Sequence, residues 1–286
     1  MKHPARLVHG IDDTSGIFSA KLIATLHDGD LLAYSARVSQ TLQDWLRERP
    51  FSLAMSSGFF SFFAHAGLLS VLIEEGFVPE RVSGSSAGAL VTAAWAGGVE
   101  PGELSTELSQ LERQHFWDPA FGPGFLRGAL FQQRLDRMLA GKTFEAARVP
   151  AAVSVFELKT RRTQVVTKGS ISTAIRASCA VPGLFHPVEI DGRLCWDGGV
   201  LDRPGLAGMP LGERVLYHHI LSQSPWRVGG AGMAIPPREN LITLAMNHLP
   251  RSGPFRLNQG RQAYEVARTL GRKALATPIE KNRVRV

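Results

Sequence analysis

The sequence predicts an α/β protein: a three-layer α/β/α sandwich around a mostly parallel central sheet. Short apolar runs typical of strands alternate with longer segments whose apolar residues recur at helical spacing. Two uncharged runs, 51–73 and 82–99, fit strands and helices that are covered on both faces. The chain has 286 residues and is 44% hydrophobic, which is enough to bury a large core.

The two uncharged runs are also long enough to cross a bilayer as helices. The first contains polar residues such as Ser56, Ser57 and His65, and the second is rich in Gly and Ser. Neither has aromatic and basic flanks at both ends, which are typical of membrane spans. We therefore interpret both runs as core.

The first 50 residues differ from the rest. Apolar residues at helical spacing within 37–49, among them Trp45 and Leu46, predict an amphipathic helix. This helix either packs on the core as a cap or lies on a membrane or a partner. We divide the chain into an N-terminal extension (1–50), a main domain (51–275) and a basic tail (276–286).

From residue 51 onward, strands and helices alternate. The predicted strands are Phe51–Met55, Arg81–Gly84, Ala151–Glu157, Thr163–Thr167, Val188–Ile190, Arg193–Trp196, Val215–Leu221 and Leu241–Met246. The predicted helices are His65–Glu75, Ser86 to about Gly97, Glu103–Gln114, Gln132–Ala140, Ser172–Ser178 and Asn258–Ala274. Asp191-Gly192 predicts a hairpin turn, and the Pro/Gly-rich segment Gln223–Glu239 predicts a long surface loop.

The segment Gly84-Ser85-Ser86-Ala87-Gly88 is the strongest chemical signal. It is a Gly-x-Ser-x-Gly sequence between an apolar run and an Ala/Leu-rich helical run. A Cβ at position 84 or 88 would press against a neighbouring strand or the following backbone. The serine at the apex would stand clear of the sheet, in front of the unpaired N–H groups of a helix N-terminus. Ser86 is therefore the candidate nucleophile.

A second signal is Asp197, which ends a hydrophobic run and precedes Gly198 and Gly199. An acid in this position would lie at a sheet edge with an exposed carboxylate. Alone, such a pattern is commonly only a turn. The segment that precedes it, Arg176–Val188, changes this interpretation.

Together these stretches resemble the patatin-like phospholipase family. The resemblance rests on Leu53–Gly67 with His65-Ala66-Gly67, on Gly84–Gly88, on Ser178–Pro187 and on Asp197-Gly198-Gly199 followed by Asp202-Arg203-Pro204. It covers roughly residues 51–275. It implies an α/β/α fold and a Ser–Asp dyad that hydrolyses acyl esters of lipids without a catalytic histidine, a metal or a cofactor. It places the nucleophile on Ser86 and the acid on Asp197.

The glycine-rich oxyanion loop of the family falls on Ser56–Phe62, where this chain departs from the pattern. The family has a run of glycines, a basic residue and another glycine, whereas this chain keeps only Gly58 and has Ser61 in the basic position. Backbone N–H groups do not depend on side chains, so Gly58 and Phe59 are the candidate oxyanion donors. A Phe at positive φ would be strained, and a different course of the loop is the alternative. The Phe residues either line an acyl-chain entrance or pack in the core.

Histidines leave a rival interpretation open. We expect His65, at the start of a helix, to be structural. An esterase of the α/β-hydrolase type would need a histidine after the acid, and His218, His219 and His248 all follow Asp197. The altered glycine loop also leaves room for a non-enzymatic scaffold that binds lipid.

Charge and cysteine content limit the partners and cofactors. The net charge of +7 favours anionic surfaces, but the basic residues are dispersed and no nucleic-acid motif accompanies them. A solvated basic face or contact with an anionic membrane surface is therefore expected, and no nucleic acid. The family resemblance implies a lipid ester substrate. Cys179 and Cys195 lack metal-ligand spacing and are expected to be buried thiols. No signal-peptide core follows Met1, which favours a cytoplasmic protein that associates with membranes.

Overall fold

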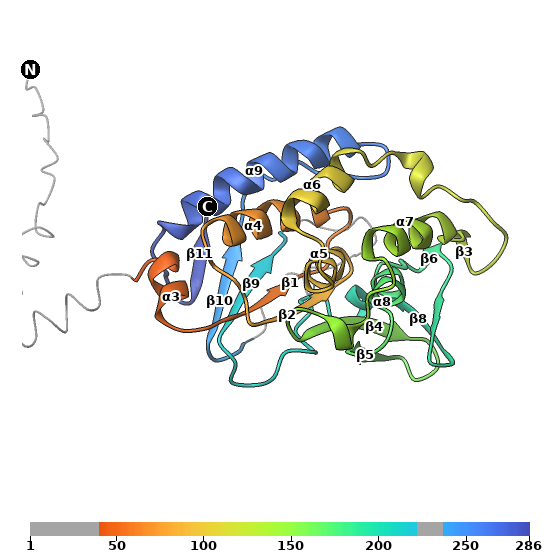
Figure 1. The fold of residues 1–286 in the computed structure, drawn as a ribbon, viewed down its shortest axis with the longest axis horizontal. Helices are drawn as coiled ribbons and strands as arrows, with labels where there is room; N and C mark the ends of the chain where they lie inside the picture. Colours follow the sequence, from red (N-terminus) through yellow and green to blue (C-terminus); the bar gives the residue numbers. More distant parts are fainter. Residues whose placement is uncertain (1–39, 222–236) are drawn as a thin grey trace, which may run out of the picture. The chain divides into compact units, whose positions relative to one another are not determined.

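The alternating pattern folds into a mostly parallel sheet flanked by helices (Figure 1). The computed structural model describes residues 40–221 and 237–286. Within them the main sheet has nine strands in the order β11-β10-β9-β1-β2-β4-β8-β7, with β5 paired to β4 outside this path. The pairs from β11 to β4 are parallel, whereas β4–β5, β4–β8 and β7–β8 are antiparallel. The predicted α/β class with a mostly parallel sheet is confirmed.

The strands of this sheet follow the apolar runs closely. Their bounds are β1 Ser52–Met55, β2 Arg81–Ser85, β4 Ala151–Glu157, β5 Arg162–Val166, β7 Val188–Ile190, β8 Arg193–Asp197, β9 Val215–His219, β10 Leu241–Ala245 and β11 Arg283–Arg285. The central strands β1, β9 and β10 are buried along their whole length. This explains why their sequences lack the apolar–polar alternation of half-exposed strands.

The helices likewise match the segments with helical spacing. They are α3 Leu42–Glu48, α4 Phe62–Glu74, α5 Ala87–Ala96, α6 Pro101–Ser109, α7 Ala129–Leu139, α8 Ile171–Ser178 and α9 Leu257–Leu275, with short 3₁₀ turns at Arg113–His115, Phe144–Ala146 and Gly198–Val200. Helix α5 is buried at every position, because it lies between β1, β2 and β4 on one side and α4 and α8 on the other. Its small residues allow these close approaches.

Apolar side chains cover both faces of the sheet. The larger cluster joins the sheet to α4, α5, α8 and α9 and includes Phe63, Leu69 and Trp95. A smaller cluster on the other face contains Ala54, Leu206, Met209, Val215, Tyr217 and Leu241. Here the chain after Asp202 runs across β1, β2 and β4. An added Cβ would touch Met55 and Ser85 backbone atoms at Gly205 and the Ala152 side chain at Gly208. The sheet is therefore buried on both sides near its centre.

The carboxyl ends of β1, β2 and β9 meet at one edge of the sheet. Met55 ends β1, which has β2 on one side and β9 on the other. The loop 56–61 leaves β1 at this edge, and the turn at Ser86 leaves β2 there. Strand β8 runs the opposite way beside β4 and pairs Asp197 with Val155. The topology thus brings three separate segments together where open α/β sheets commonly bind ligands.

The differences from the sequence prediction lie in short elements. β3 (Gly124–Leu126) and β6 (Gly183–Phe185) form a separate parallel ribbon that the sequence does not indicate, because three residues carry too little periodicity. β11 lies within the predicted basic tail, where Val284 is buried between two exposed arginines and the strand pairs with β10. Most of the predicted loop Gln223–Glu239 lies outside the described residues.

The described part of the N-terminal extension forms α3. Its N-cap, Thr41, accepts a hydrogen bond from the Asp44 N–H, and the Asp44 carboxylate accepts one from the Thr41 N–H. The helix buries Leu42, Trp45 and Leu46 in the main core, so its apolar face is used within the fold. No helix in the described ranges is both long and apolar enough to cross a membrane.

Candidate active site

The turn between β2 and α5 places Ser86 on a strained backbone. Its φ is 51° and its ψ is −118°, a conformation that costs a non-glycine residue about 1–3 kcal/mol. An added Cβ at Gly88 would lie 2.1 Å from the Met55 carbonyl oxygen. One at Gly84 would lie 2.5 Å from the Gly88 carbonyl carbon. The two glycines therefore permit the close approach of β1, β2 and α5 that the sequence predicts.

Asp197, at the end of β8, faces this serine. Ser86 Oγ donates a hydrogen bond to Asp197 Oδ2 at 2.7 Å. The other oxygen, Oδ1, accepts one from the Gly199 N–H, also at 2.7 Å. Asp197 is only 6% exposed, so the expectation of an exposed carboxylate is wrong. The chain after α8 covers the sheet edge here, and the Asp197 N–H donates to the Ala180 carbonyl.

Two further side chains hold the turn in place. Ser178 Oγ accepts from the Ser86 N–H at 2.8 Å and donates to the Ser154 carbonyl at 2.7 Å. Asp202 accepts from Ser154 Oγ at 2.6 Å and from the N–H groups of the three residues 205–207. Sequence reasoning assigned no role to Ser178 or Asp202. The sequence could have indicated these roles, because Ser178 and Asp202 each lie in a stretch that carries the family resemblance.

The loop between β1 and α4 takes an unusual course at Phe60. This residue has a φ of 57°, whereas Gly58 keeps an ordinary negative φ. The Phe60 ring lies 5.0 Å from that of Phe59, 5.4 Å from Phe62 and 5.6 Å from Phe116, measured between centroids. These ring contacts offset the cost of a left-handed phenylalanine. The backbone strain that the sequence analysis considers for this loop is therefore present, and it lies at Phe60.

The candidate oxyanion donors lie in the same loop. Gly58 and Phe59 line the same cavity as Ser86. Among the described residues, neither N–H group donates a hydrogen bond, while the neighbouring Ser57 N–H donates to the Arg203 carbonyl at 2.8 Å. An added Cβ at Gly58 would lie 2.5 Å from Ser61 Oγ and 2.9 Å from Ser61 Cβ, so a larger residue here would displace the Ser61 side chain. The role of these two N–H groups stays a prediction.

A pair of buried imidazoles supports the base of the loop. His65 Nε2 donates to the Ser56 carbonyl at 2.8 Å, and His65 Nδ1 lies 2.9 Å from His218 Nδ1. Because the first bond fixes the proton of a neutral His65 on Nε2, His218 must donate the second bond from Nδ1. Burial lowers the pKa of His65 to about 3 and that of His218 well below its ordinary value. His65 thus has structural contacts, as the sequence analysis expects.

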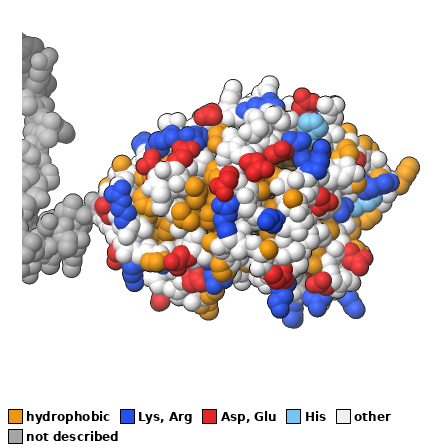
Figure 2. All heavy atoms as spheres, in the orientation of Figure 1, with side chains coloured by type: hydrophobic (Ala, Val, Ile, Leu, Met, Phe, Trp, Pro, Cys, Tyr) orange, Lys and Arg blue, Asp and Glu red, His pale blue; other side chains and the backbone are white. Residues whose placement is uncertain are grey.

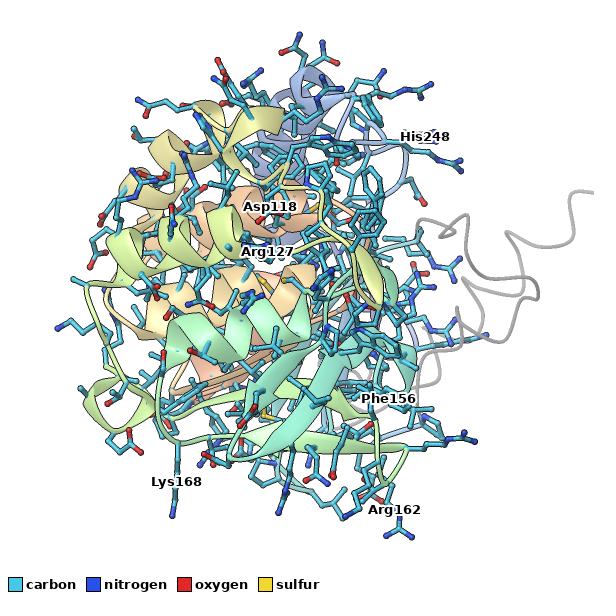
Figure 3. All side chains as sticks on the ribbon, turned by 90° about the vertical axis from the view of Figure 1, so that its right-hand side faces the viewer. Asp118, Arg127, Phe156, Arg162, Lys168 and His248 are labelled. Atoms are coloured by element: carbon cyan, nitrogen blue, oxygen red, sulfur yellow. The ribbon has the colours of Figure 1, made fainter. Side chains whose placement is uncertain are left out.

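The other two histidines considered as bases, His219 and His248, have a partner or a position away from Ser86. The Tyr217 hydroxyl lies 2.8 Å from His219 Nδ1, and burial lowers the pKa of His219 to about 4. His248 is exposed and lies at the periphery of the face that Figure 3 turns to the viewer. The side chain that Ser86 Oγ contacts is a carboxylate, which disfavours a histidine base.

Ser86 and Asp197 lie on the wall of a cavity of about 420 Å³, a size typical of small-molecule sites. Its lining is mainly apolar and comes from the loop after β1, from α5, α6 and α7, and from the segment around β6. The apolar lining residues are Phe59, Phe60, Phe62, Ala87, Leu90, Leu104, Leu108, Leu111, Phe116, Phe131, Leu135, Met138, Val181, Pro182, Phe185 and Val200. An extended hydrocarbon chain would suit this lining.

A few polar side chains interrupt the apolar wall. Arg134 forms a 2.8 Å ion pair with Glu107, which joins α7 to α6. Arg203 is 8% exposed and donates from Nη2 to the Ile220 carbonyl at 3.0 Å. A buried cation therefore borders the cavity although Ser61 replaces the basic residue of the loop. Cys179 also lines the cavity and is only half-buried, unlike Cys195; burial and the Asp197 charge raise its thiol pKa.

In the described ranges, His, Cys, Asp and Glu are the side chains that would hold a metal ion. These ranges contain no group of three or more such side chains that could hold one.

Comparison with known proteins gives one family and several relatives. A family model described as patatin-like phospholipase matches residues 53–208. An uncharacterized NTE family protein of Mycobacterium tuberculosis is 32% identical over 154 residues, which are 53% of this chain and 43% of the relative. An uncharacterized NTE family protein of Mycobacterium bovis is 31% identical over 159 residues, 54% of this chain and 27% of the relative. This chain therefore aligns with less than half the length of these relatives.

Solved structures that align with this chain are more distant in sequence. VipD from Legionella pneumophila has a TM-score of 0.47 at 14% identity, over 69% of this chain and 50% of VipD. The type III effector ExoU has a TM-score of 0.44 at 15% identity, over 79% of this chain and 52% of ExoU. ExoU belongs to the type III secretion system of Pseudomonas aeruginosa.

Proposed function

The chain belongs to the patatin-like phospholipase family, and from this premise we propose that it is a serine-dependent lipid acyl hydrolase. Its substrates would be carboxylic esters of phospholipids and related lipids. One observation carries the proposal: Ser86 Oγ donates to Asp197 Oδ2 at 2.7 Å on the wall of an apolar cavity. The contact joins a nucleophile to a base, and the cavity provides room for an acyl chain.

Acylation would begin with proton transfer from Ser86 Oγ to Asp197 Oδ2. The oxygen attacks the ester carbonyl carbon, and the carbonyl oxygen becomes an anion. When this tetrahedral species collapses, the bond to the lipid alcohol breaks and Asp197 returns the proton to the leaving oxygen. The acyl group stays on Ser86 as an ester.

Deacylation would repeat these steps with water. A water molecule gives its proton to Asp197 and attacks the acyl carbon. Collapse releases the carboxylic acid, and Ser86 Oγ recovers its proton. Asp197 suits this double role because the Gly199 N–H holds one of its oxygens and leaves the other directed at Ser86.

Stabilisation of the anion would come from the backbone of the altered loop. We assign it to the N–H groups of Gly58 and Phe59, which line the cavity beside Ser86. Each such donor is worth about 3–4 kcal/mol of transition-state stabilisation in comparable sites. The buried guanidinium of Arg203 adds a positive field at the cavity wall. In the family pattern a basic residue of the loop, at the position of Ser61, carries such a charge.

Labelling with a fluorophosphonate probe tests the proposal. The wild-type chain should be labelled at Ser86, and Ser86→Ala should lose both the label and the turnover of a short p-nitrophenyl ester. A matched control is Ser85→Ala, since Ser85 precedes the nucleophile but its hydroxyl is buried without a partner in the described structure. Absence of labelling in the folded wild-type protein would favour a lipid-binding scaffold instead.

A further inference from the structure

Exposed aromatic side chains gather around β3. Phe121 is 107% exposed, Phe255 69% and Phe125 52%. The half-buried Trp117 joins them, with its ring 5.6 Å from that of Phe125 and 5.7 Å from that of Phe255. We call these four residues the aromatic face. In Figure 2, apolar side chains protrude at the end of the molecule that carries β3 and β6.

Phe121 projects from the tip of a short turn. The Ala120 N–H donates to the Phe125 carbonyl, and Pro119 and Leu126 form an isolated bridge. This pairing holds the two arms of the turn and leaves the phenylalanine between them in water. An ordered backbone that presents one large apolar side chain to solvent is typical of a surface that becomes covered.

Arginines surround the aromatic face. The Arg113 guanidinium lies 5.4 Å from the centre of the Trp117 ring and 5.2 Å from that of Phe255. Arg127 and Arg256 are exposed next to the same elements, and none of the three pairs with an acidic side chain among the described residues. Such arginines are available for phosphate groups.

Two acidic groups near these arginines offset part of their charge. Asp118 lies near Arg127 on the face shown in Figure 3, but its carboxylate accepts hydrogen bonds from the N–H groups of residues 128–130 at the start of α7. Glu112 is the exposed acid next to Arg113 in the chain. The three arginines around the aromatic face therefore outnumber the two acidic groups beside them.

The aromatic face adjoins the candidate active site. Phe116 precedes Trp117 and lines the cavity, and so does Phe185 of β6, which pairs with Leu126 of β3. After Asp197, Val200 lines the cavity and is 38% exposed, and Leu201 is 57% exposed. Residues that line the cavity therefore neighbour the aromatic face along the chain and across the β3–β6 ribbon.

We propose that the aromatic face docks on an anionic phospholipid bilayer, with Phe121 inserted below the headgroups and the arginines bound to lipid phosphates. A bilayer fits a protruding phenylalanine, a half-buried tryptophan and unpaired arginines, because apolar rings enter the acyl boundary while cations stay at headgroup level. The purpose of docking rests on the proposed function, since it would bring lipid esters to the cavity. Binding itself does not require turnover.

Vesicle sedimentation of the full chain tests this proposal. The Ser86→Ala protein should bind vesicles of phosphatidylcholine with phosphatidylglycerol better than pure phosphatidylcholine vesicles, and added salt should weaken binding. Phe121→Ser should lower the partition coefficient about tenfold or more. Arg113→Gln should lower it about fivefold on anionic vesicles only. Phe121 is fully exposed, so its replacement should leave the fold unchanged.

Matched controls are available on the same chain. Leu211 is 92% exposed in the turn before β9, at the opposite edge of the sheet, and Leu211→Ser should bind like the parent. Arg162 is exposed on β5, well away from Arg127 in Figure 3, and serves as the control for charge. Phe121→Ser in the active protein should keep its turnover of a short soluble ester, which separates docking from catalysis.

Two results would overturn the proposal. One is equal binding by Phe121→Ser and Leu211→Ser. The other is a dimer in solution that Phe121→Ser dissociates, without vesicle binding by either form; this would identify the aromatic face as a contact with a second copy. If the wild-type protein binds vesicles but does not hydrolyse esters, the proposed function is refuted and the docking proposal stands.

Discussion

The turn at Ser86 and the loop at Phe60 make the same uncommon backbone bend by different means. Ser86 has a φ of 51° and Phe60 a φ of 57°. At Ser86, neighbouring glycines at 84 and 88 leave no room for a Cβ, and contacts are made by backbone atoms. At Phe60, three other aromatic rings surround the bend. One bend is held by the absence of side chains and the other by their packing.

The supports beneath the two bends also differ. Ser178 and Ser154 hold the Ser86 turn through a hydroxyl and a carbonyl, which do not titrate near neutral pH. His65 holds the base of the loop through an imidazole that must stay neutral. The serine turn should therefore be insensitive to aromatic substitutions, whereas the loop should respond to them and to protonation of its imidazole.

The largest expected effect concerns the turn and its carboxylate partner. Asp197→Asn should lower the turnover of a p-nitrophenyl ester by about 10³–10⁴-fold, because an amide cannot accept the Ser86 proton. The variant should stay folded, since the Gly199 N–H can still donate to the amide oxygen. Initial rates and thermal unfolding would check both expectations.

Histidine variants provide the contrast for Asp197→Asn. His248→Ala removes an exposed side chain and should leave the rate unchanged. His219→Ala should leave most of the specific activity of the folded protein, because its ring contacts Tyr217. A histidine variant that is folded and as inactive as Asp197→Asn would establish a triad of the α/β-hydrolase type.

The next effect should come from the loop. Gly58→Val would place a Cβ within 2.5 Å of Ser61 Oγ and shift the N–H groups of residues 58 and 59. If these donate to the oxyanion, kcat should fall about 10²–10³-fold with little change in KM, since the anion forms only in the transition state. Gly76→Ala, at an open turn with φ 78°, is the control for glycine replacement.

Ser61→Arg tests whether this loop needs the positive charge that the family pattern has at this position. Because Arg203 already borders the cavity, the added arginine should leave kcat unchanged or raise it slightly. A large increase would show that the native loop is deficient in charge. A folded Gly58→Val protein with normal kcat would remove Gly58 and Phe59 from the oxyanion site.

The sequence predicts the serine turn better than the loop for a physical reason. Gly84 and Gly88 are required by contacts with backbone a few residues away, so a short motif contains most of the information. The course of the loop depends on Phe116, which is more than fifty residues distant and makes ring contact only in the folded chain. The sequence could therefore raise the possibility of strain without placing it on Phe60.

The burial of Asp197 also depends on residues outside its own motif, so the sequence does not predict it. The strand before this residue and the glycines after it indicate only a turn with an acid, and the family resemblance implies that Asp197 pairs with Ser86, a contact that the structure contains. They contain nothing about the segment from Ala180 that covers the carboxylate. The ribbon of β3 and β6 was likewise missed, because its partner strands are short and almost sixty residues apart.

Acid should destabilise the loop after β1 before it destabilises the turn at Ser86. Burial lowers the pKa of His65 from 6.5 to about 3, so the unfolded chain binds more protons between these values. By linkage, the stability that the neutral imidazole provides is complete above about pH 6.5 and is lost as the pH falls toward 3. The free energy of unfolding should drop by ~3 kcal/mol from this group between pH 7 and pH 4.

Urea unfolding at pH 7, 5 and 4 measures this drop. A double replacement, His65→Leu with His218→Leu, removes both imidazoles and should reduce the pH dependence to the part that remains from His219, whose pKa burial lowers to about 4, whatever its effect at pH 7. His248→Gln changes an exposed histidine and should leave the profile as in the wild type. Equal slopes in the double variant and the wild type would place the acid sensitivity elsewhere.

The smallest expected effect is an opposite change in the free energy of unfolding when Ser86 and Phe60 are each replaced by glycine. Ser86→Gly removes a Cβ from a backbone with φ 51° and should raise the free energy of unfolding by about 1 kcal/mol relative to Ser86→Ala. Phe60→Gly gains the same relief at φ 57° but loses three ring contacts, so stability should fall by roughly 1–3 kcal/mol. Chemical denaturation of the three variants would measure both differences. Stabilisation by glycine at both positions would mean that the rings of the loop pack too weakly to hold its bend, and the contrast between the two regions would disappear.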